Sequence, residues 1–110
     1  MNKKQTGELI VLTGQLLSEK EIVINPNDGF DLGLMMTEAA VELYFGNSST
    51  QVPDNTQYVP LQAKLIQKNE CKLGTVELGS KSIQKLDGNT KIRLYLEEQD
   101  GHSKLLIGTV

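Results

Sequence analysis

The chain has 110 residues, of which 38% are hydrophobic and 23% are charged, and its formal net charge is −3. These values are typical of one globular domain and exclude an intrinsically disordered chain. They also argue against a nucleic-acid-binding protein, because phosphate binding requires clustered basic residues and Arg93 is the only arginine.

The N-terminal third predicts short strands and turns. Residues 1–4 (MNKK) indicate a solubilising terminus. The segments ELIVLT (8–13) and EIVIN (21–25) are short and rich in β-branched residues, as strands are. NPNDG (25–29) is dense in turn formers and predicts a turn. FDLGLMM (30–36) alternates at first, which predicts extended chain with Phe30, Leu32 and Leu34 on one side.

Residues 37–45 are compatible with two structures. As a short helix, the segment would begin at a capping threonine at position 37 and end at the glycine at position 46. As a strand, it would place Val41, Leu43 and Phe45 toward the core and Tyr44 on the outside. The alternation favours the strand, and the short helix remains the alternative.

The central part predicts a long connection and then a hairpin. Residues 46–57 have no apolar periodicity, which is typical of a mobile or functional segment. Residues 61–78 predict a hairpin with its turn at Asn69-Glu70, which would set Leu65 opposite Gly74. Residues 81–90 predict a connection that has room for one helical turn.

The C-terminal segment, residues 91–110, gives the clearest prediction. Asp100-Gly101 suits a type I′ turn between two apolar strands. A three-residue loop is the alternative, because KLGTV (72–76) and LLIGTV (105–110) repeat a Gly-Thr-Val sequence that would then share a face. The two-residue turn predicts these pairs: Gln99 with His102, Glu97 with Lys104, Leu96 with Leu105, Tyr95 with Leu106, Leu94 with Ile107 and Ile92 with Thr109.

Together, these elements predict a single all-β domain over residues 1–110. The expected architecture is an antiparallel β-sandwich, or an open barrel, of about seven or eight short strands. A parallel α/β fold is not expected, because no long amphipathic helices alternate with the strands.

Residues that could perform catalysis or bind metal are few. His102, the only histidine, is next to the predicted turn, and Cys71, the only cysteine, is on the other predicted hairpin, so we expect no nucleophile–base pair and no enzyme. The acidic residues at positions 19, 21, 97 and 98 are explained by a solvated rim. The oxygen-bearing cluster Asn25, Asn27, Asp28 and Asp31 would suit calcium, but its spacing differs from an EF-hand and turn formation explains it. We expect no metal and no cofactor.

Binding residues are suggested by aromatic side chains. Tyr44 and Tyr95 fall on the outer faces of their predicted strands, and Tyr58 flanks the long connection. Tyrosines in such places favour contact with a partner. The sequence therefore predicts partner binding by Tyr44, Tyr58 and Tyr95.

A resemblance points in the same direction. LGTVEL (73–78) followed by IRLYLEEQDG (92–101) is similar to the β-sandwich of Hsp70-type substrate-binding domains, where a Leu-Gly and a strand precede an alternating strand that ends in an acidic-Gly turn. The similarity covers less than a third of the chain, and the nucleotide domain and helical lid of that family have no counterpart. It implies a peptide-binding β-domain.

These observations predict a non-catalytic β-module that binds a protein or peptide, or that associates with itself. A small-ligand binder or an enzyme with a pocket in the sandwich is the alternative from another class. We expect a soluble, cytoplasmic protein, because one cysteine cannot form an internal disulfide and no apolar run has the length of a signal peptide or a membrane span. We expect no nucleic-acid or membrane partner.

Overall fold

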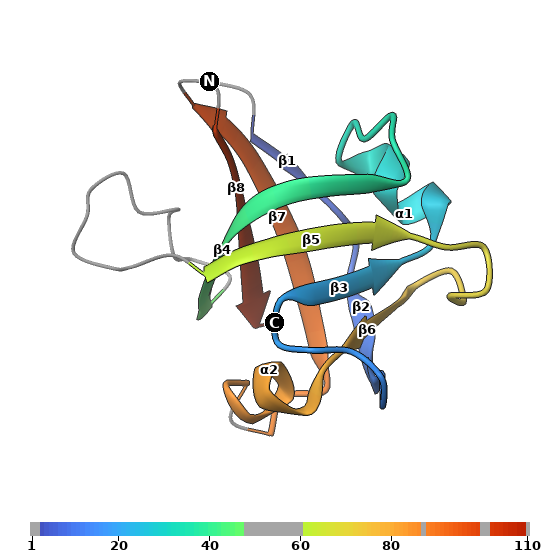
Figure 1. Cartoon of the computed structure of the whole chain (residues 1–110), viewed down its shortest axis with the longest axis vertical. Coiled ribbons are helices and arrows are strands. Elements are labelled where there is room, and N and C mark those ends of the chain that lie inside the picture. The colour runs from blue at the N-terminus through green and yellow to red at the C-terminus, as the bar shows by residue number, and fades with distance from the viewer. Residues whose placement is uncertain (1–2, 48–60, 87, 100–101, 110) are drawn as a thin grey trace.

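A computed structural model of the chain describes residues 3–47, 61–86, 88–99 and 102–109. The chain is mostly β, with 53% strand and 13% helix, and seven strands close into a mixed β-barrel (Figure 1). The elements are β1 (Lys3–Gln5), β2 (Leu9–Thr13), β3 (Glu21–Ile24), α1 (Pro26–Asp31), β4 (Glu38–Asn47), β5 (Leu61–Gln67), β6 (Thr75–Leu78), α2 (Ser80–Gln84), β7 (Lys91–Gln99) and β8 (His102–Thr109).

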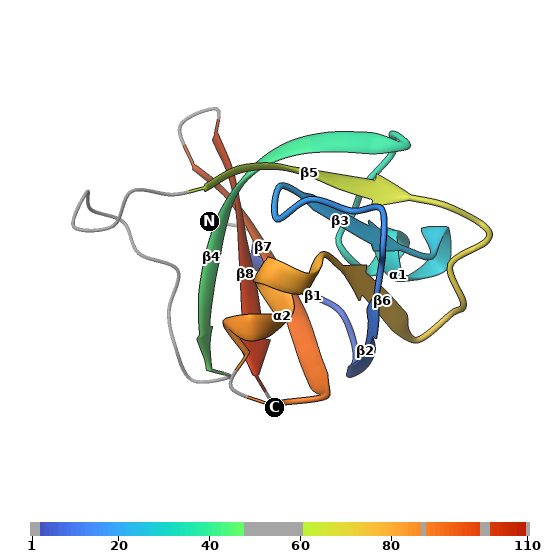
Figure 2. The same ribbon diagram turned by 60° about the horizontal axis from the view of Figure 1, so that its bottom comes forward.

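The strands follow one another around the barrel in the order β7-β2-β6-β3-β5-β4-β8, and β8 returns to β7 (Figure 2). β1 pairs with β7 beside the β2–β7 pairing. Three pairs are parallel, namely β2–β6, β3–β5 and β4–β8, and the others are antiparallel. The prediction of a mostly β domain is therefore confirmed. The alternative of a barrel is correct in part, since the barrel is closed and mixed, whereas the antiparallel sandwich is wrong.

Aliphatic side chains fill the barrel. One cluster joins inward-facing residues of the seven strands with Leu32 and Leu86, which follow the two helices. Every second residue of a strand points inward, so these positions alternate along the chain. The buried members include Leu9, Ile22, Ile24, Val41, Leu43, Ala63, Leu65, Val76, Leu78, Ile92, Leu94, Leu96, Leu105 and Ile107.

The C-terminal hairpin has the predicted register. β7 and β8 pair from Gln99 opposite His102 to Ile92 opposite Thr109, with Leu96 opposite Leu105 and Leu94 opposite Ile107. The turn residues themselves, 100 and 101, lie outside the described residues. The alternative with a three-residue loop is wrong. The two Gly-Thr-Val sequences on which it was based are not structurally equivalent. Gly74 has a φ of 81° in the connection before β6, whereas Gly108 pairs within β8.

Residues 38–45 of the ambiguous segment lie in β4, which confirms the favoured alternative. Val41 and Leu43 are buried in the core and Phe45 packs against it. The short helix at 37–45 is wrong, because residues 38–43 complete a ladder with β5.

Other predicted elements differ from the structure. The hairpin over residues 61–78 is wrong: β5 and β6 both form, but β3 lies between them and pairs with each. The turn at 25–29 is also wrong, because Asn25 caps α1 with its side chain and Pro26 occupies the first helical turn. Extended chain at 30–36 is wrong as well, since Phe30 lies exposed in α1 while Leu32 is buried. Finally, residues 3 and 4 of the expected solubilising terminus belong to β1, which ends at Gln5.

The barrel contains an internal repeat that the sequence does not display. β2-β3-α1-β4 and β5-β6-α2-β7 have the same element order, and one residue joins strand to helix in each, Asn25 and Gly79. Residue 10 corresponds to residue 64, a shift of 54 positions, and the strand pairs are related by the same shift. Ile10 lies opposite Thr75, and their equivalents, Lys64 and Glu21, lie opposite each other. Four pairs of backbone hydrogen bonds are also related by this shift. Ile10 N to Gly74 O matches Lys64 N to Lys20 O, and Gly14 N to Leu78 O matches Lys68 N to Ile24 O. Leu17 N to Gly14 O matches Cys71 N to Lys68 O, and Glu21 N to Ser18 O matches Thr75 N to Lys72 O.

The two halves are therefore related by an approximate two-fold axis. The antiparallel pair of Val23 and Glu77 sits on this axis, because the shift of 54 positions exchanges these two residues. β8 has no counterpart and lies between β4 and β7, so it interrupts the symmetry.

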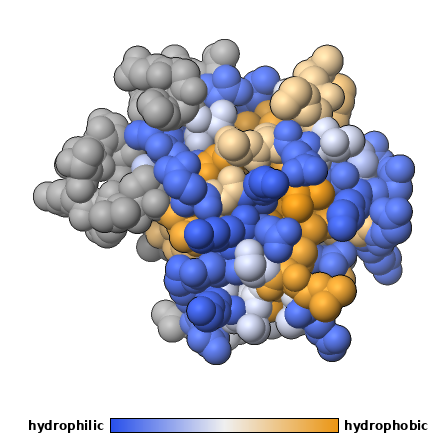
Figure 3. Space-filling view, in the orientation of Figure 1, coloured by the Kyte–Doolittle hydropathy of each residue, from blue (hydrophilic) through white to orange (hydrophobic). Residues whose placement is uncertain are grey.

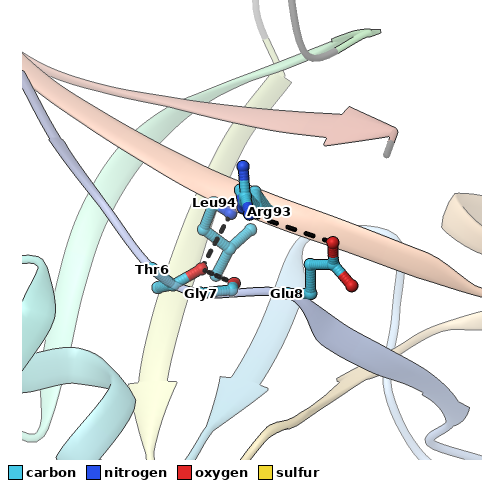
Figure 4. Close-up of polar contacts among 5 residues, drawn as sticks. All are labelled: Thr6, Gly7, Glu8, Arg93 and Leu94. Carbon is cyan, nitrogen blue, oxygen red and sulfur yellow. Dashed lines mark hydrogen bonds and ion pairs between the residues drawn. The ribbon is translucent and has the colours of Figure 1, made fainter.

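Thr6 holds the break between β1 and β2 (Figure 4). Its backbone N donates to Leu94 O (3.0 Å), and its side-chain Oγ1 accepts from Leu94 N (3.1 Å), so the hydroxyl completes the ladder where the strand is interrupted. Next to it, the Arg93 Nη2 lies 3.8 Å from a Glu8 carboxylate oxygen. The hydroxyl is thus a structural acceptor.

We expect the substitution Thr6→Val to destabilise the fold by about 1–3 kcal/mol, because it leaves the buried Leu94 N–H without an acceptor. Thr6→Ser keeps the hydroxyl and should retain most of the stability. Urea unfolding of the three chains measures the difference. Equal losses for Val and Ser would show that the methyl group, and not the hydrogen bond, is what matters.

Candidate functional site

A surface groove lies on the two-fold axis, on the outside of the barrel. Its volume is about 690 Å³. Thr13 at the end of β2 and residues 14–17 of the connection after it form one wall, and residues 68, 70 and 71 of the connection after β5 form the other. Val23 and Glu77 form its floor. Figure 3 shows a band of apolar side chains on this face, which runs from the area of β3 toward the β2–β3 connection.

The walls are equivalent in backbone and different in side chains. The same hydrogen bonds hold both, since Leu17 N donates to Gly14 O and Cys71 N donates to Lys68 O. Across the axis, however, Leu16 corresponds to Glu70. The backbone frame is thus repeated, while the chemistry of the groove is not.

Leu16 is the most prominent feature of the groove. Its side chain is 98% exposed, which is unusual for a leucine in a folded domain and contributes nothing to the core. Ile10 and Leu12, on the outer face of the adjoining β2, are also exposed, at 50% and 44%. Leu12 lies opposite Glu77 in the β2–β6 ladder, so this apolar strip meets the floor of the groove.

Cys71 lines the groove with a buried thiol. Its Sγ lies 3.6 Å from Thr75 Oγ1 and 3.6 Å from Val23 O. Burial raises the pKa of this thiol above its ordinary value of 9.0, and the negative charge of Glu77 acts in the same direction, whereas the contact with Thr75 lowers it. The thiol is therefore protonated near neutral pH and is a poor nucleophile.

This environment predicts a slow reaction of Cys71 with iodoacetamide. At pH 8 we expect the native chain to react at least about tenfold more slowly than the chain unfolded in guanidinium chloride. Because the folded pKa is raised, the protonated thiol contributes stability below pH about 9, and this contribution is lost as the pH rises further. Alkylation rates across pH 7–10 check this, and a native rate equal to the unfolded rate would contradict it.

Two of the three predicted partner-binding tyrosines lie within the described residues, and both are buried. Tyr44 and Tyr95 are on the outer face, as predicted, but they are only 8% and 6% exposed. Each lies opposite Leu106 of β8, and the three form a separate buried cluster. The expected exposure of these two rings is therefore wrong, and partner binding by Tyr44 and Tyr95 stays a prediction. Tyr58 lies outside the described residues.

The calcium-like cluster has structural roles instead. The Asn25 Oδ1 accepts from Asn27 N and its Nδ2 donates to Cys71 O, both at 2.8 Å. The Asp28 Oδ2 accepts from Gly74 N at 3.0 Å. These bonds attach α1 to the 71–74 connection. Among the described residues, no group of three or more His, Cys, Asp and Glu side chains is placed to hold a metal ion.

The other candidate groups remain apart. His102 begins β8, which contributes no described residue to the groove that Cys71 lines. Of the acidic residues expected at a solvated rim, Glu97 is instead nearly buried, and Glu21 Oε1 accepts from Ser18 N at 3.0 Å.

Sequence reasoning missed the groove, although two signals were present. Leu16 and Leu17 are adjacent leucines in a connection, where polar residues are usual. β2 is apolar on both faces (LIVL), which a strand with one face in water does not require. Both signals indicate apolar side chains beyond those needed by the core.

Comparison with known proteins finds no matching family, no matching curated protein and no matching solved structure. The similarity to Hsp70-type substrate-binding domains rests on residues that the structure places in β6 and β7, which lie on either side of β2 in a closed barrel. In the described part of the chain, no helix combines the length and apolar character needed to cross a bilayer.

Proposed function

We propose that this protein is a non-catalytic binding module that holds a polypeptide segment in the groove on its two-fold axis. The observation that carries the proposal is the full exposure of Leu16 on the wall of the groove. An aliphatic side chain in that place gains free energy only when another molecule covers it.

The shape and position of the site support a polypeptide over a small molecule. The exposed apolar surface continues from the groove onto Leu12 and Ile10, so it is longer than the groove itself. The described interior of the barrel is filled by the aliphatic cluster, which leaves the ligand to bind on the outside. The protonated thiol of Cys71 suits a binding surface better than a nucleophilic site.

Selection of random displayed peptides against the full chain tests the proposal. We expect peptides that bind the native chain and lose at least about tenfold in affinity against Leu16→Arg, which places a long charged side chain on the wall. Met35→Arg is the matched control, because Met35 is 94% exposed but does not line the groove. Failure to select any peptide, or equal losses for both variants, would overturn the proposal.

A further inference from the structure

We infer that the groove selects an extended peptide with aliphatic side chains at alternate positions and a lysine or arginine beside them. This inference rests on the proposed function and names the chemistry of its ligand. It is carried by the spacing of the exposed aliphatic residues, by the half-buried carboxylate of Glu77 on the floor, and by the way in which the two halves of the repeat differ.

The spacing comes from β2. Ile10 and Leu12 are two positions apart on one face of the strand, so their side chains are separated by about 7 Å. Alternate side chains of an extended peptide have the same separation. A peptide that lies along β2 therefore places two aliphatic side chains against Ile10 and Leu12 in register, and each contact removes apolar surface from water.

The charge comes from Glu77. Its side chain is half-buried on the floor, directly across the ladder from Leu12. It forms a hydrogen bond with the uncharged thiol of Cys71, and the ion pairs in the described part of the chain join other groups, Lys64 with Glu38 and Arg93 with Glu8. A ligand that covers the apolar strip also excludes water from this carboxylate. A cation on the ligand then gives a charge-assisted hydrogen bond in place of the lost hydration.

The repeat shows that these side chains are not required by the fold. At two pairs of equivalent positions, the first half has an aliphatic residue and the second half has a glutamate: Val23 with Glu77, and Leu16 with Glu70. The first wall, which also contains Thr13 and Gln15, and half of the floor therefore carry an aliphatic side chain where the other wall and the other half of the floor carry a glutamate. Lys68 also lines the second wall, and the two glutamates outnumber it. This division matches a ligand that is aliphatic on one side and basic on the other.

The experiment uses a positional-scanning library of acetylated nonapeptides, with binding to the full chain measured by fluorescence polarisation at two salt concentrations. We expect preference for Val, Ile or Leu at two positions separated by one residue, and for Lys or Arg next to them. The best peptide should lose about tenfold in affinity against Glu77→Gln and should bind more weakly in high salt. Glu98→Gln is the matched control, since Glu98 is an exposed carboxylate on β7, outside the groove.

Each result decides something. Peptides that bind at Leu16 but show no preference for a basic residue, or that bind Glu77→Gln as well as the native chain, would overturn the inference and leave the proposed function standing. A library with no binder would overturn both. Equal losses for Glu77→Gln and Glu98→Gln would show a general effect of net charge, which also overturns the inference.

Discussion

The substitution Gly79→Ala is expected to destabilise the protein by about 2–4 kcal/mol, although it adds a single methyl group. An ideal Cβ at this position would lie 2.6 Å from Leu17 O and 2.7 Å from Ser18 O. The φ of −68° is open to every L-residue, so the cost is entirely steric. The Ser18 carbonyl cannot retreat cheaply, because it accepts a hydrogen bond from Glu21 N at 3.2 Å.

Gly7→Ala is the matched control for this prediction. No atom lies within 4 Å of the Cβ that this change would introduce, so the stability should change by about 0.5 kcal/mol or less. Urea unfolding followed by far-UV circular dichroism measures both variants. A Gly79→Ala chain as stable as Gly7→Ala would mean that the α2 end of the barrel yields more readily than its hydrogen bonds indicate.

Leu32→Ala and Leu86→Ala should each lower the free energy of unfolding by about 3 kcal/mol. These leucines occupy equivalent positions after α1 and α2, and both are buried in the same core cluster. Leu32 N donates to Gly29 O and Leu86 N donates to Ile83 O, each at 3.0 Å, so the two helices end in the same way. Similar losses of stability would show that the two halves of the repeat contribute equally to the core.

Leu16→Ala supplies the baseline for these core substitutions. The same atoms are removed from an exposed side chain, so the change should be about 0.5 kcal/mol or less. Thermal and urea unfolding check the three variants together. A large loss at Leu86 with none at Leu32 would show that the two halves share geometry but do not contribute equally to stability.

The sequence indicated which side of each strand faces the core better than it indicated which strands are neighbours. The β7–β8 register was predictable because a two-residue Asp-Gly turn fixes it locally. The neighbours of β5 were not predictable in this way. β3, from far earlier in the chain, lies between β5 and β6. The alternation that points Leu65 and Val76 toward the core is the same whichever strand is the neighbour.

Short helices were hard to predict for a related reason. Asn25 and Pro26 are signals of a helix start, but they are equally signals of a turn, and six residues are too few to show an apolar period. The strand at 38–47 was decided by its alternation, which its ladder with β5 confirms. Local sequence patterns therefore predicted which residues face the core and the register of one strand pair, whereas the barrel depends on pairings between residues that are far apart in the chain.

The candidate site was hidden for the same reason. Its lining comes from two connections and three strands, which only the two-fold arrangement brings together. Alternation correctly placed Tyr44 and Tyr95 on the outside of their strands. It could not reveal that both would be buried against Leu106, because that requires β4 and β7 to flank β8.

The position of β8 has a consequence for synthesis on the ribosome. β4 and β7 meet only through this strand, so a nascent chain that has not yet released residues 102–109 presents two open sheet edges at once. Those edges bracket the apolar residues that Leu105 and Ile107 later cover. During this interval the emerging polypeptide needs protection from aggregation.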